Sequence, residues 1–213
     1  MADAIQGALQ SYLDGLVPTR HPELVQMEDY ARSKGFPIIG PACGHLCYQV
    51  ARIMGARRVF ELGSGYGYST AWFGRAVQEN GGGVVHHTVW DAGLSGLARR
   101  HLNAMGLDHL VQFHVSEAVA ALEAQPGPYD LIFCDIDKEG YPGALPAIEG
   151  KLRAGGVLIV DNLLWGNRVF DPSRHDKATE GVRELTRLVT RSPGWISSIL
   201  PIRDGILLAY RVP

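Results

Sequence analysis

The most informative stretch of this chain is Arg58-Val-Phe-Glu-Leu-Gly-Ser-Gly-Tyr-Gly-Tyr-Ser69. Its first five residues are mostly apolar and predict a short strand. Gly63, Gly65 and Gly67 then follow at alternate positions, and residues 69–78 predict a helix. A strand that leads through glycines into a helix brings backbone amides close to a ligand at the end of a parallel sheet. The stretch therefore predicts an α/β fold with a binding site at this turn.

Two interpretations of this glycine loop are open. A glycine-rich turn can serve only to connect a strand with a helix, and its spacing is not the G-x-G-x-x-G of a dinucleotide-binding fold. Glu61 favours a binding loop, because a carboxylate just before the glycines has little packing value and suits the binding of hydroxyls or an amine.

The remaining sequence alternates helices and strands. Periodicity predicts three helices before the first strand, at 4–16, 22–33 and 41–54. The expected strands are 58–62, 84–90, 110–115, 129–135, 156–160, 196–201 and 206–210, and the helices between them are 69–78, 94–105, 116–124, 141–152 and 179–191. Arg203-Asp204-Gly205 predicts a tight hairpin between the last two strands. We predict an α/β fold: a doubly wound, mostly parallel, seven-stranded Rossmann-like sheet with a C-terminal antiparallel hairpin and an N-terminal helical cap.

Length and composition are typical of one globular domain. The chain has 213 residues, of which 46% are apolar and 20% are charged. We expect a single domain over residues 1–213, with a helical cap at 1–56 and an α/β core at 57–213. The net charge of −2 argues against nucleic acid as the main partner. Neither a leader peptide nor a bilayer-spanning run is visible, so we expect a cytoplasmic location without membrane contact.

The cysteines bear on the redox compartment. Three cysteines, an odd number, indicate a reducing compartment rather than a disulfide framework. Cys43 and Cys47 lie one helical turn apart with His45 between them, which raises the alternative of a metal site. His45 would point to another face of that helix, so buried thiols are the favoured interpretation.

Polar residues follow two further predicted strands. Asp135-Ile-Asp-Lys138 comes after one strand, and Asp161-Asn162 comes after the next. Because the carboxyl ends of parallel strands face the ligand crevice, Asp135, Asp161 and Asn162 should converge. Two carboxylates and an amide oxygen form a partial shell for Mg²⁺, Mn²⁺ or Ca²⁺. The alternative is that they are turn and cap residues, which are common after strands.

Several motifs together point to a known family. They are Glu61-Leu-Gly with Gly67-Tyr-Ser69, Asp135-x-Asp-Lys138-x-x-Tyr141, and Leu152-Arg-x-Gly-Gly156 with Asp161-Asn-x-x-Trp165-Gly166. These motifs resemble the cation-dependent O-methyltransferases, the family of catechol and caffeoyl-CoA O-methyltransferases and their bacterial relatives. The helices before the first strand and Leu200-Pro-x-x-Asp204-Gly205 also look like the bacterial members, so the resemblance spans nearly the whole chain.

The resemblance implies a cofactor, a metal, a substrate and an assembly. It implies that S-adenosylmethionine is bound by Ile39, Glu61, Gly63, Gly65, Gly67, Ser69, Ser116 and Asp135. It implies that Asp135, Asp161 and Asn162 hold a divalent cation, Mg²⁺ before Mn²⁺ or Ca²⁺, and that Lys138 is the base, beside Asp135. The implied substrate is a catechol-like aromatic small molecule with a vicinal diol, bound by Trp165 and Lys138. A homodimer is also implied.

Physical chemistry agrees with these roles. A vicinal diol can chelate the cation, which lowers the pKa of the bound hydroxyl. Lys138 can then take the proton, and the sulfonium methyl lies in line with the oxygen, so that transfer needs little beyond orientation and desolvation. The chain contains only four lysines against sixteen arginines, which suggests that position 138 needs an amine.

The sequence departs from the family pattern at two positions. The family places an acid for the ribose hydroxyls where this chain has Val89, and the nearest carboxylate is Asp91. If the second strand were shifted by two residues, each side chain would stay on the same face of the sheet, and Asp91 could bind the ribose. The alternative is that Asp91 caps the next helix. Thr186 replaces the asparagine usual in bacterial relatives. Trp165 can wall an aromatic substrate or pack in the core, and both interpretations stay open.

Three other functions explain the sequence less well than methylation of a small molecule does. Members of the same family methylate hydroxyuridine in tRNA, but the lack of net positive charge counts against that substrate. A nucleotide-binding module without catalysis, or a dehydrogenase, would have no use for Asp135, Asp161, Asn162 and Lys138 together. A dehydrogenase would also continue with another parallel unit in place of the terminal hairpin.

Overall fold

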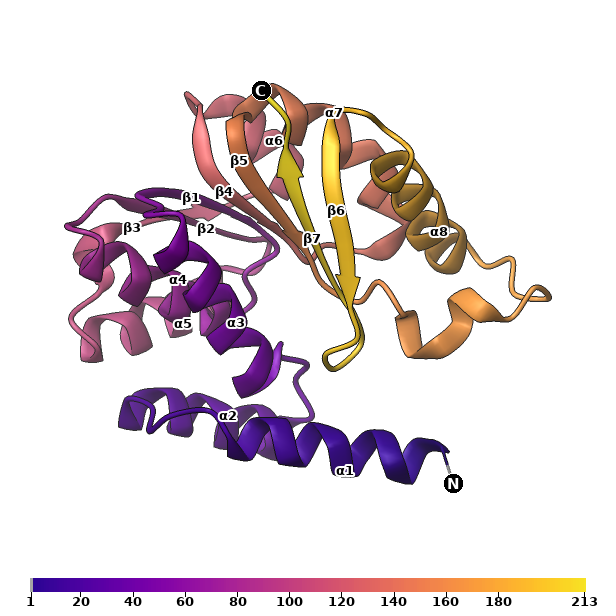
Figure 1. The fold of residues 1–213 in the computed structure, drawn as a ribbon. Helices are drawn as coiled ribbons and strands as arrows, with labels where there is room; N and C mark the ends of the chain where they lie inside the picture. The colour runs from indigo at the N-terminus through magenta and orange to yellow at the C-terminus, as the bar shows by residue number, and fades with distance from the viewer. Residues whose placement is uncertain (1) are drawn as a thin grey trace.

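The computed structural model describes residues 2–213, with side chains from residue 7 onward. One seven-stranded sheet runs through the molecule in the order β3-β2-β1-β4-β5-β7-β6 (Figure 1). The strands are β1 (Arg58–Leu62), β2 (Val84–Val89), β3 (Val111–Val115), β4 (Tyr129–Cys134), β5 (Leu152–Val160), β6 (Trp195–Leu200) and β7 (Ile206–Arg211). The first five are parallel, and β7 is antiparallel to both β5 and β6. The predicted fold class is confirmed.

Helices cover both faces of the sheet. They are α1 (Ala2–Gly15), α2 (Pro22–Lys34), α3 (Gly40–Ile53), α4 (Tyr68–Glu79), α5 (Ala92–Ala104), α6 (Ala118–Ala124), α7 (Tyr141–Lys151) and α8 (Lys177–Thr190). Because side chains alternate along a strand, Val59 packs in the core under α3, α4 and α5, whereas Phe60 packs in the core under α6, α7 and α8. None of the helices in the described part of the chain is long and apolar enough to cross a membrane.

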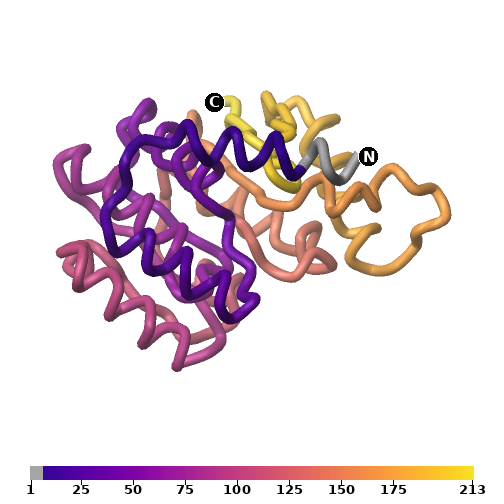
Figure 2. Tube along the Cα trace, turned by 90° about the horizontal axis from the view of Figure 1, so that it is seen from below, coloured from indigo at the N-terminus to yellow at the C-terminus, as the bar shows by residue number. Residues whose placement is uncertain are grey.

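The first three helices pack on one side of the sheet. Helices α1 and α2 lie below the rest of the molecule in Figure 1, so they face the viewer in Figure 2, which is seen from below. Helix α2 begins with Pro22 in its first turn and ends at Gly35 in the left-handed conformation (φ 62°), both common helix boundaries. Helix α3 packs on α4, and Cys43 and Cys47 of α3 are buried free thiols, as predicted.

Element boundaries differ from the prediction at several places. β5 begins at Leu152 rather than at residue 156, because Leu152 pairs with Tyr129 before a register shift in the ladder with β4. Three short 3₁₀ helices were not predicted: η1 (Asp108–Leu110), η2 (Lys138–Gly140) and η3 (Trp165–Phe170). The second and third follow the ends of β4 and β5, where the sequence analysis placed the chemistry.

Candidate active site

A cavity of about 810 Å³ opens at the carboxyl ends of β1, β2, β4 and β5. Its walls come from the glycine loop, the segment before α3, the turns after β2 and β3, and the turns that follow β4 and β5. Of the predicted site residues, those that line it are Ile39, Gly63, Gly65, Ser69, Ser116, Asp135, Lys138, Asn162 and Trp165. Residues from across the sequence thus meet at one edge of the sheet, as expected for an open α/β sheet.

The glycine loop needs its glycines. Gly63, Gly65 and Gly67 have φ values of 85°, 50° and 90°, a left-handed backbone that other residues rarely adopt. A Cβ atom on Gly63 would overlap the carbonyl oxygen of Asp135, so this loop lies directly against the end of β4. Ser64 and Thr88 exchange two hydrogen bonds: the Ser64 amide donates to the Thr88 carbonyl (2.9 Å), and the Thr88 amide donates to Ser64 Oγ (3.0 Å). The loop is therefore held rigidly over the cavity.

Glu61 lies beneath this loop with no access to solvent. Burial raises the pKa of its carboxyl to about 7, and the nearby hydroxyls of Ser69, Thr70 and Ser64 offset only part of that rise. Neither Oε1 nor Oε2 has a hydrogen-bond partner of normal geometry. A buried carboxylate without partners is costly, and one placed directly behind a binding loop fits a cofactor that brings polar groups of its own. The cavity and its loop thus fit S-adenosylmethionine.

Asp91 lies outside the cavity. Its Oδ1 accepts a hydrogen bond from the Leu94 amide (2.8 Å), so Asp91 is the N-cap of α5. β2 pairs with β1 without a bulge from Arg58–Val84 to Phe60–His86, and Val89 and Trp90 line the cavity at the end of β2. The helix-cap geometry is thus present, and the binding of ribose by Asp91 stays a prediction.

The three predicted metal ligands converge, and both carboxylates among them already accept hydrogen bonds. Lys138 Nζ donates to Asp135 Oδ1 (2.7 Å). Asp161 Oδ1 accepts from the Asn162 backbone amide (2.8 Å), and Asp161 Oδ2 accepts from Arg203 Nη1 (2.8 Å). Burial, followed by the charge of Asp135, raises the pKa of Asp161 to about 7, whereas the charge of Arg203 lowers it.

This arrangement does not fit a divalent cation. Both oxygens of Asp161 are hydrogen-bonded, and Oδ2 pairs with the guanidinium of Arg203. The described residues contain no group of three or more His, Cys, Asp or Glu side chains suited to hold a metal. The metal role of Asp135, Asp161 and Asn162 therefore stays a prediction from the resemblance, and no chemical step is assigned to a cation here.

Arg203 is the site residue that the sequence analysis missed. It follows β6 at the tip of the hairpin and reaches back to Asp161, 42 residues earlier in the chain. Its backbone is left-handed (φ 53°), and the other non-glycine residues of the described chain with positive φ are Asn162, Trp165 and Asn167. Such residues cluster at functional sites. A sequence signal existed in the placement of an arginine directly before Asp204-Gly205, but it indicated only a turn.

Lys138 lies between two aromatic rings at the cavity wall. Its Nζ is 5.3 Å from the ring centre of Tyr141 and 5.7 Å from that of Trp165. The Tyr141 hydroxyl donates to the Asp161 carbonyl (2.8 Å), which ties the turn after β4 to the end of β5. A Cβ on Gly181 of α8 would overlap the Lys138 carbonyl, so this helix also supports the lysine.

Trp165 and Thr186 differ in their position relative to the cavity. Trp165 lines the cavity and also packs against the core under α6, α7 and α8, and its contact with a substrate stays a prediction. Thr186 does not line the cavity, and its Oγ1 donates to the Val182 carbonyl one turn earlier in α8 (2.8 Å). A Cβ atom on Gly67 would overlap Ala98 of α5, and Gly67 is not among the residues that line the cavity.

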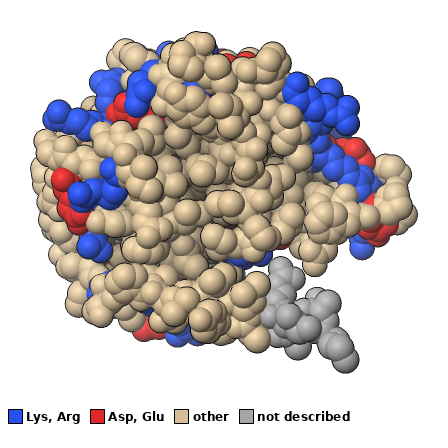
Figure 3. All heavy atoms as spheres, viewed as in Figure 1, with Lys and Arg blue, Asp and Glu red and all other residues tan. Residues whose placement is uncertain are grey.

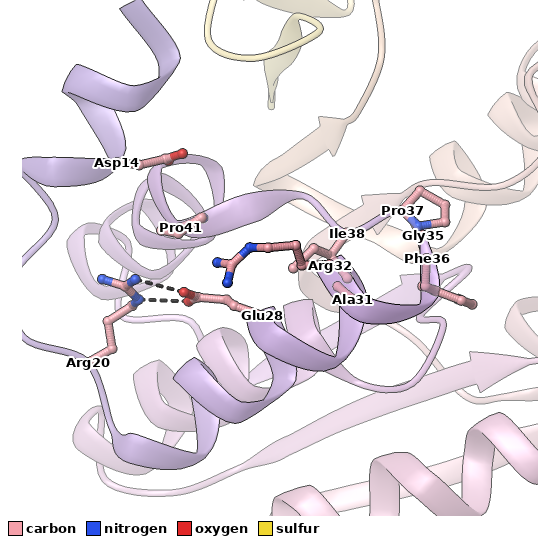
Figure 4. Close-up of a pocket in the computed structure, with 10 residues that line it drawn as sticks. All are labelled: Asp14, Arg20, Glu28, Ala31, Arg32, Gly35, Phe36, Pro37, Ile38 and Pro41. Carbon is pink, nitrogen blue, oxygen red and sulfur yellow. Dashed lines mark hydrogen bonds and ion pairs between the residues drawn. The ribbon is translucent and has the colours of Figure 1, made fainter. Parts of the chain in front are cut away.

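A second cavity, of about 560 Å³, lies among the first three helices and shares the wall of Phe36, Pro37 and Ile38 with the first. Figure 4 shows Arg20 and Glu28 pointing toward one another across it. Both Glu28 oxygens accept from Arg20 at 2.7 Å, and the Tyr68 hydroxyl also donates to Glu28 (2.8 Å). The charged pair is therefore satisfied internally.

Comparison with known proteins identifies the family. Residues 23–212 match the model of a family described as O-methyltransferase. The chain belongs to the O-methyltransferase family. This match covers the elements from α2 to β7, and so includes the glycine loop, Lys138 and the hairpin that carries Arg203.

Relatives of this O-methyltransferase agree with that assignment. It is 26% identical over 220 residues to the catechol O-methyltransferase of Niastella koreensis, covering 98% of this chain and 99% of that protein. It is 28% identical over 192 residues to a putative O-methyltransferase of Mycobacterium bovis, covering 88% and 84%. Its fold matches the O-methyltransferase TomG from Streptomyces achromogenes in complex with S-adenosylmethionine, with a TM-score of 0.86, 26% identity, and coverage of 97% and 96%.

Proposed function

We propose that this O-methyltransferase transfers a methyl group from S-adenosylmethionine to a hydroxyl of a catechol-like aromatic small molecule. The observation that carries the proposal is the placement of Lys138: its amine lies at the cavity wall, held by Asp135 (2.7 Å) and flanked by the Trp165 ring (5.7 Å). An aromatic ring stacked near Trp165 would bring its hydroxyl to that amine.

The cofactor fits the other half of the cavity. The related TomG structure holds S-adenosylmethionine, and in this chain Gly63, Gly65, Ser69, Ser116 and Ile39 line the cavity. Bound S-adenosylmethionine supplies an electrophilic methyl group on a sulfonium. Glu61 and Gly67 would support the loop that holds it, and we retain Asp135 among the cofactor contacts.

The chain's own residues supply the proton chemistry and the orientation. Lys138, in its neutral form, would accept the proton of the substrate hydroxyl, and Asp135 would hold the resulting ammonium. Trp165 and the backbone near Ile39 would keep water from the reacting atoms. Orientation in a dry cavity accounts for most of the acceleration that a methyl transfer needs.

The cation dependence implied by the resemblance is not part of this mechanism, because Arg203 occupies the partner position at Asp161. A tRNA substrate is the second candidate within the family. The net charge is −2, and on the face shown in Figure 3 charged atoms of both signs lie mainly at the margins with an uncharged centre. Both observations favour a small molecule. The homodimer and the cytoplasmic location stay predictions.

The proposal is tested by incubating the protein with labelled S-adenosylmethionine against a panel of catechols and against tRNA. Label should transfer to a catechol oxygen, and the labelled product should be a methyl ether. Transfer to tRNA alone would replace the small-molecule substrate with a nucleic acid, and transfer to neither would contradict the proposed function.

A further inference from the structure

Two carboxylates and two organic cations meet at the end of β4 and β5. Asp135 pairs with Lys138, and Asp161 pairs with Arg203. The Asp161 side chain is only 1% exposed and that of Arg203 is 26% exposed, so the second pair is largely shielded from water. A buried carboxylate needs a positive partner, and in this chain the partner is a side chain.

We propose that the guanidinium of Arg203 is the resident cation of this site, in place of the divalent metal that the predicted ligands Asp135, Asp161 and Asn162 would hold. The effect of Arg203 on methyl transfer rests on the proposed function. Its effect on metal binding can be measured whether or not the protein catalyses that reaction.

The hairpin tip holds Arg203 in one position. The Asp204 side chain accepts from the Gly166 amide (2.6 Å) and from Asn162 Nδ2 (3.1 Å), which ties the tip to the turn after β5. The Leu164 amide donates to the Asp204 carbonyl (2.8 Å), and the Gly205 amide donates to the Ile202 carbonyl (3.0 Å). The guanidinium therefore extends from a rigid turn rather than from a mobile loop.

The backbone at position 203 is costly for an arginine. Its φ of 53° lies in the left-handed region, where glycine is free of strain and a residue with a Cβ is not. Arg203 keeps this conformation while its side chain reaches a buried carboxylate. The strain is consistent with a position whose side chain is required.

The charges balance without a metal. When the Lys138 amine carries its proton, Asp135 and Asp161 are offset by Lys138 and Arg203, and an added divalent cation would face a guanidinium at Asp161 Oδ2.

The atoms and electrons of the methyl transfer balance when the cation of the site is the Arg203 guanidinium. The substrate O–H bond breaks and its proton passes to Lys138, an O–C bond forms to the methyl carbon, and the C–S bond breaks with its electron pair on sulfur, which gives S-adenosylhomocysteine. Arg203 would contribute a fixed positive charge near the developing oxyanion, the role that electrostatic preorganisation requires, without chelating two oxygens.

The most direct test measures the affinity of the protein for Mn²⁺ in the absence of the methyl-transfer reaction. Mn²⁺ is titrated into the full chain by calorimetry and by the paramagnetic resonance signal of the free ion, using wild type, Arg203→Gly, Arg203→Lys and, as a matched control, Arg174→Gly in the exposed loop before α8. Arg203→Gly should bind Mn²⁺ about 10- to 100-fold more tightly than wild type, the scale by which groups around a metal ligand alter affinity. Arg203→Lys and Arg174→Gly should match wild type.

Turnover gives the second readout. Wild-type transfer should be unchanged in excess EDTA, whereas transfer by Arg203→Gly should fall in EDTA and recover with Mg²⁺ or Mn²⁺. Tight stoichiometric Mn²⁺ binding by wild type, or loss of wild-type activity in EDTA with recovery on Mg²⁺, would overturn the inference even if Arg203→Gly failed to fold. If no hydroxyl is methylated at all, the proposed function fails, while the Mn²⁺ titrations still decide the role of Arg203.

Discussion

Three acidic residues near the cavity have three different environments. Glu61 is buried without a hydrogen-bond partner of normal geometry, Asp135 is paired with Lys138, and Asp91 caps a helix at the surface. The same functional group is thus used for cofactor support, for holding an amine and for local structure. Substitutions at these positions should therefore affect different properties: cofactor binding, the rate of methyl transfer, or the stability of the fold.

Lys138 is expected to control the chemical step. Lys138→Met keeps the aliphatic stem and removes the amine, so the rate of transfer should fall by about 10²–10⁴-fold, the usual effect of losing a general base. S-Adenosylmethionine affinity, measured by calorimetry, should change little. Lys34→Met, at the exposed end of α2, is the matched control and should keep full activity. A Lys138→Met enzyme with a normal rate and pH profile would show that Lys138 is not the base.

Glu61 should make stability fall as the pH rises. Burial raises the pKa of Glu61 from 4.5 to about 7, so the folded state binds the proton more tightly than the unfolded state does. Its contribution is fully present below about pH 4.5 and is lost as the pH passes through 7, with a magnitude on the order of 3 kcal/mol. Glu61→Gln has no such titration and should unfold at a higher temperature than wild type at pH 8.

The difference between Glu61→Gln and wild type should shrink toward pH 5. Thermal unfolding without cofactor, recorded at several pH values, measures it, and Glu123→Gln on the exposed surface of α6 is the control. Parallel stability curves for Glu61→Gln and wild type would show that Glu61 does not titrate in the folded protein.

Asp91 is expected to act on stability through its helix cap. Asp91→Ala should lower the free energy of unfolding by about 1 kcal/mol, the usual effect of losing an N-cap, because the Leu94 amide loses its acceptor. Asp91→Asn can still cap and should cost less. If S-adenosylmethionine instead binds more weakly by about 1.5–3 kcal/mol with stability intact, Asp91 binds the ribose.

At the scale of the elements, α3 and α4 pack closely against one another at Gly44. A Cβ on Gly44 would overlap the indole of Trp72, so Gly44→Ala should destabilise the protein by about 1–3 kcal/mol, the usual effect of overpacking. Gly96 lies in α5 with open space around it, so Gly96→Ala should stabilise by about 0.4–1 kcal/mol. Chemical denaturation of both variants measures the two effects. Equal effects would mean that the two helices are not packed this closely.

The elements also show what the sequence could predict. Strands such as β1 and β4 are recognisable because a short apolar run is followed by glycine or by Asp135, and these local patterns placed most of the site. Arg203 could not be placed in this way, because its partner Asp161 lies 42 residues away and the contact depends on how the hairpin packs on the turn after β5. The occupant of the predicted metal position is therefore a tertiary feature that local patterns do not contain.

At the scale of the whole molecule, the helical cap and the sheet should unfold together. The core under α3, α4 and α5 also contains Leu24 and Met27 of α2, both fully buried. Calorimetry should therefore show one transition whose calorimetric and van't Hoff enthalpies agree. Two separate transitions would show that residues 1–56 form a unit of their own.

The strand order has a consequence for protein synthesis. β7 lies between β5 and β6, although it is the latest of the seven strands in the sequence. As the chain leaves the ribosome, β5 therefore has an unpaired edge and β6 has no partner until β7 emerges, and such edges favour aggregation. The hairpin that brings Arg203 to Asp161 forms in the same late step. A ribosome stalled before β7 would thus hold a nascent chain with its glycine loop complete but with the Asp161 carboxylate still without its cation.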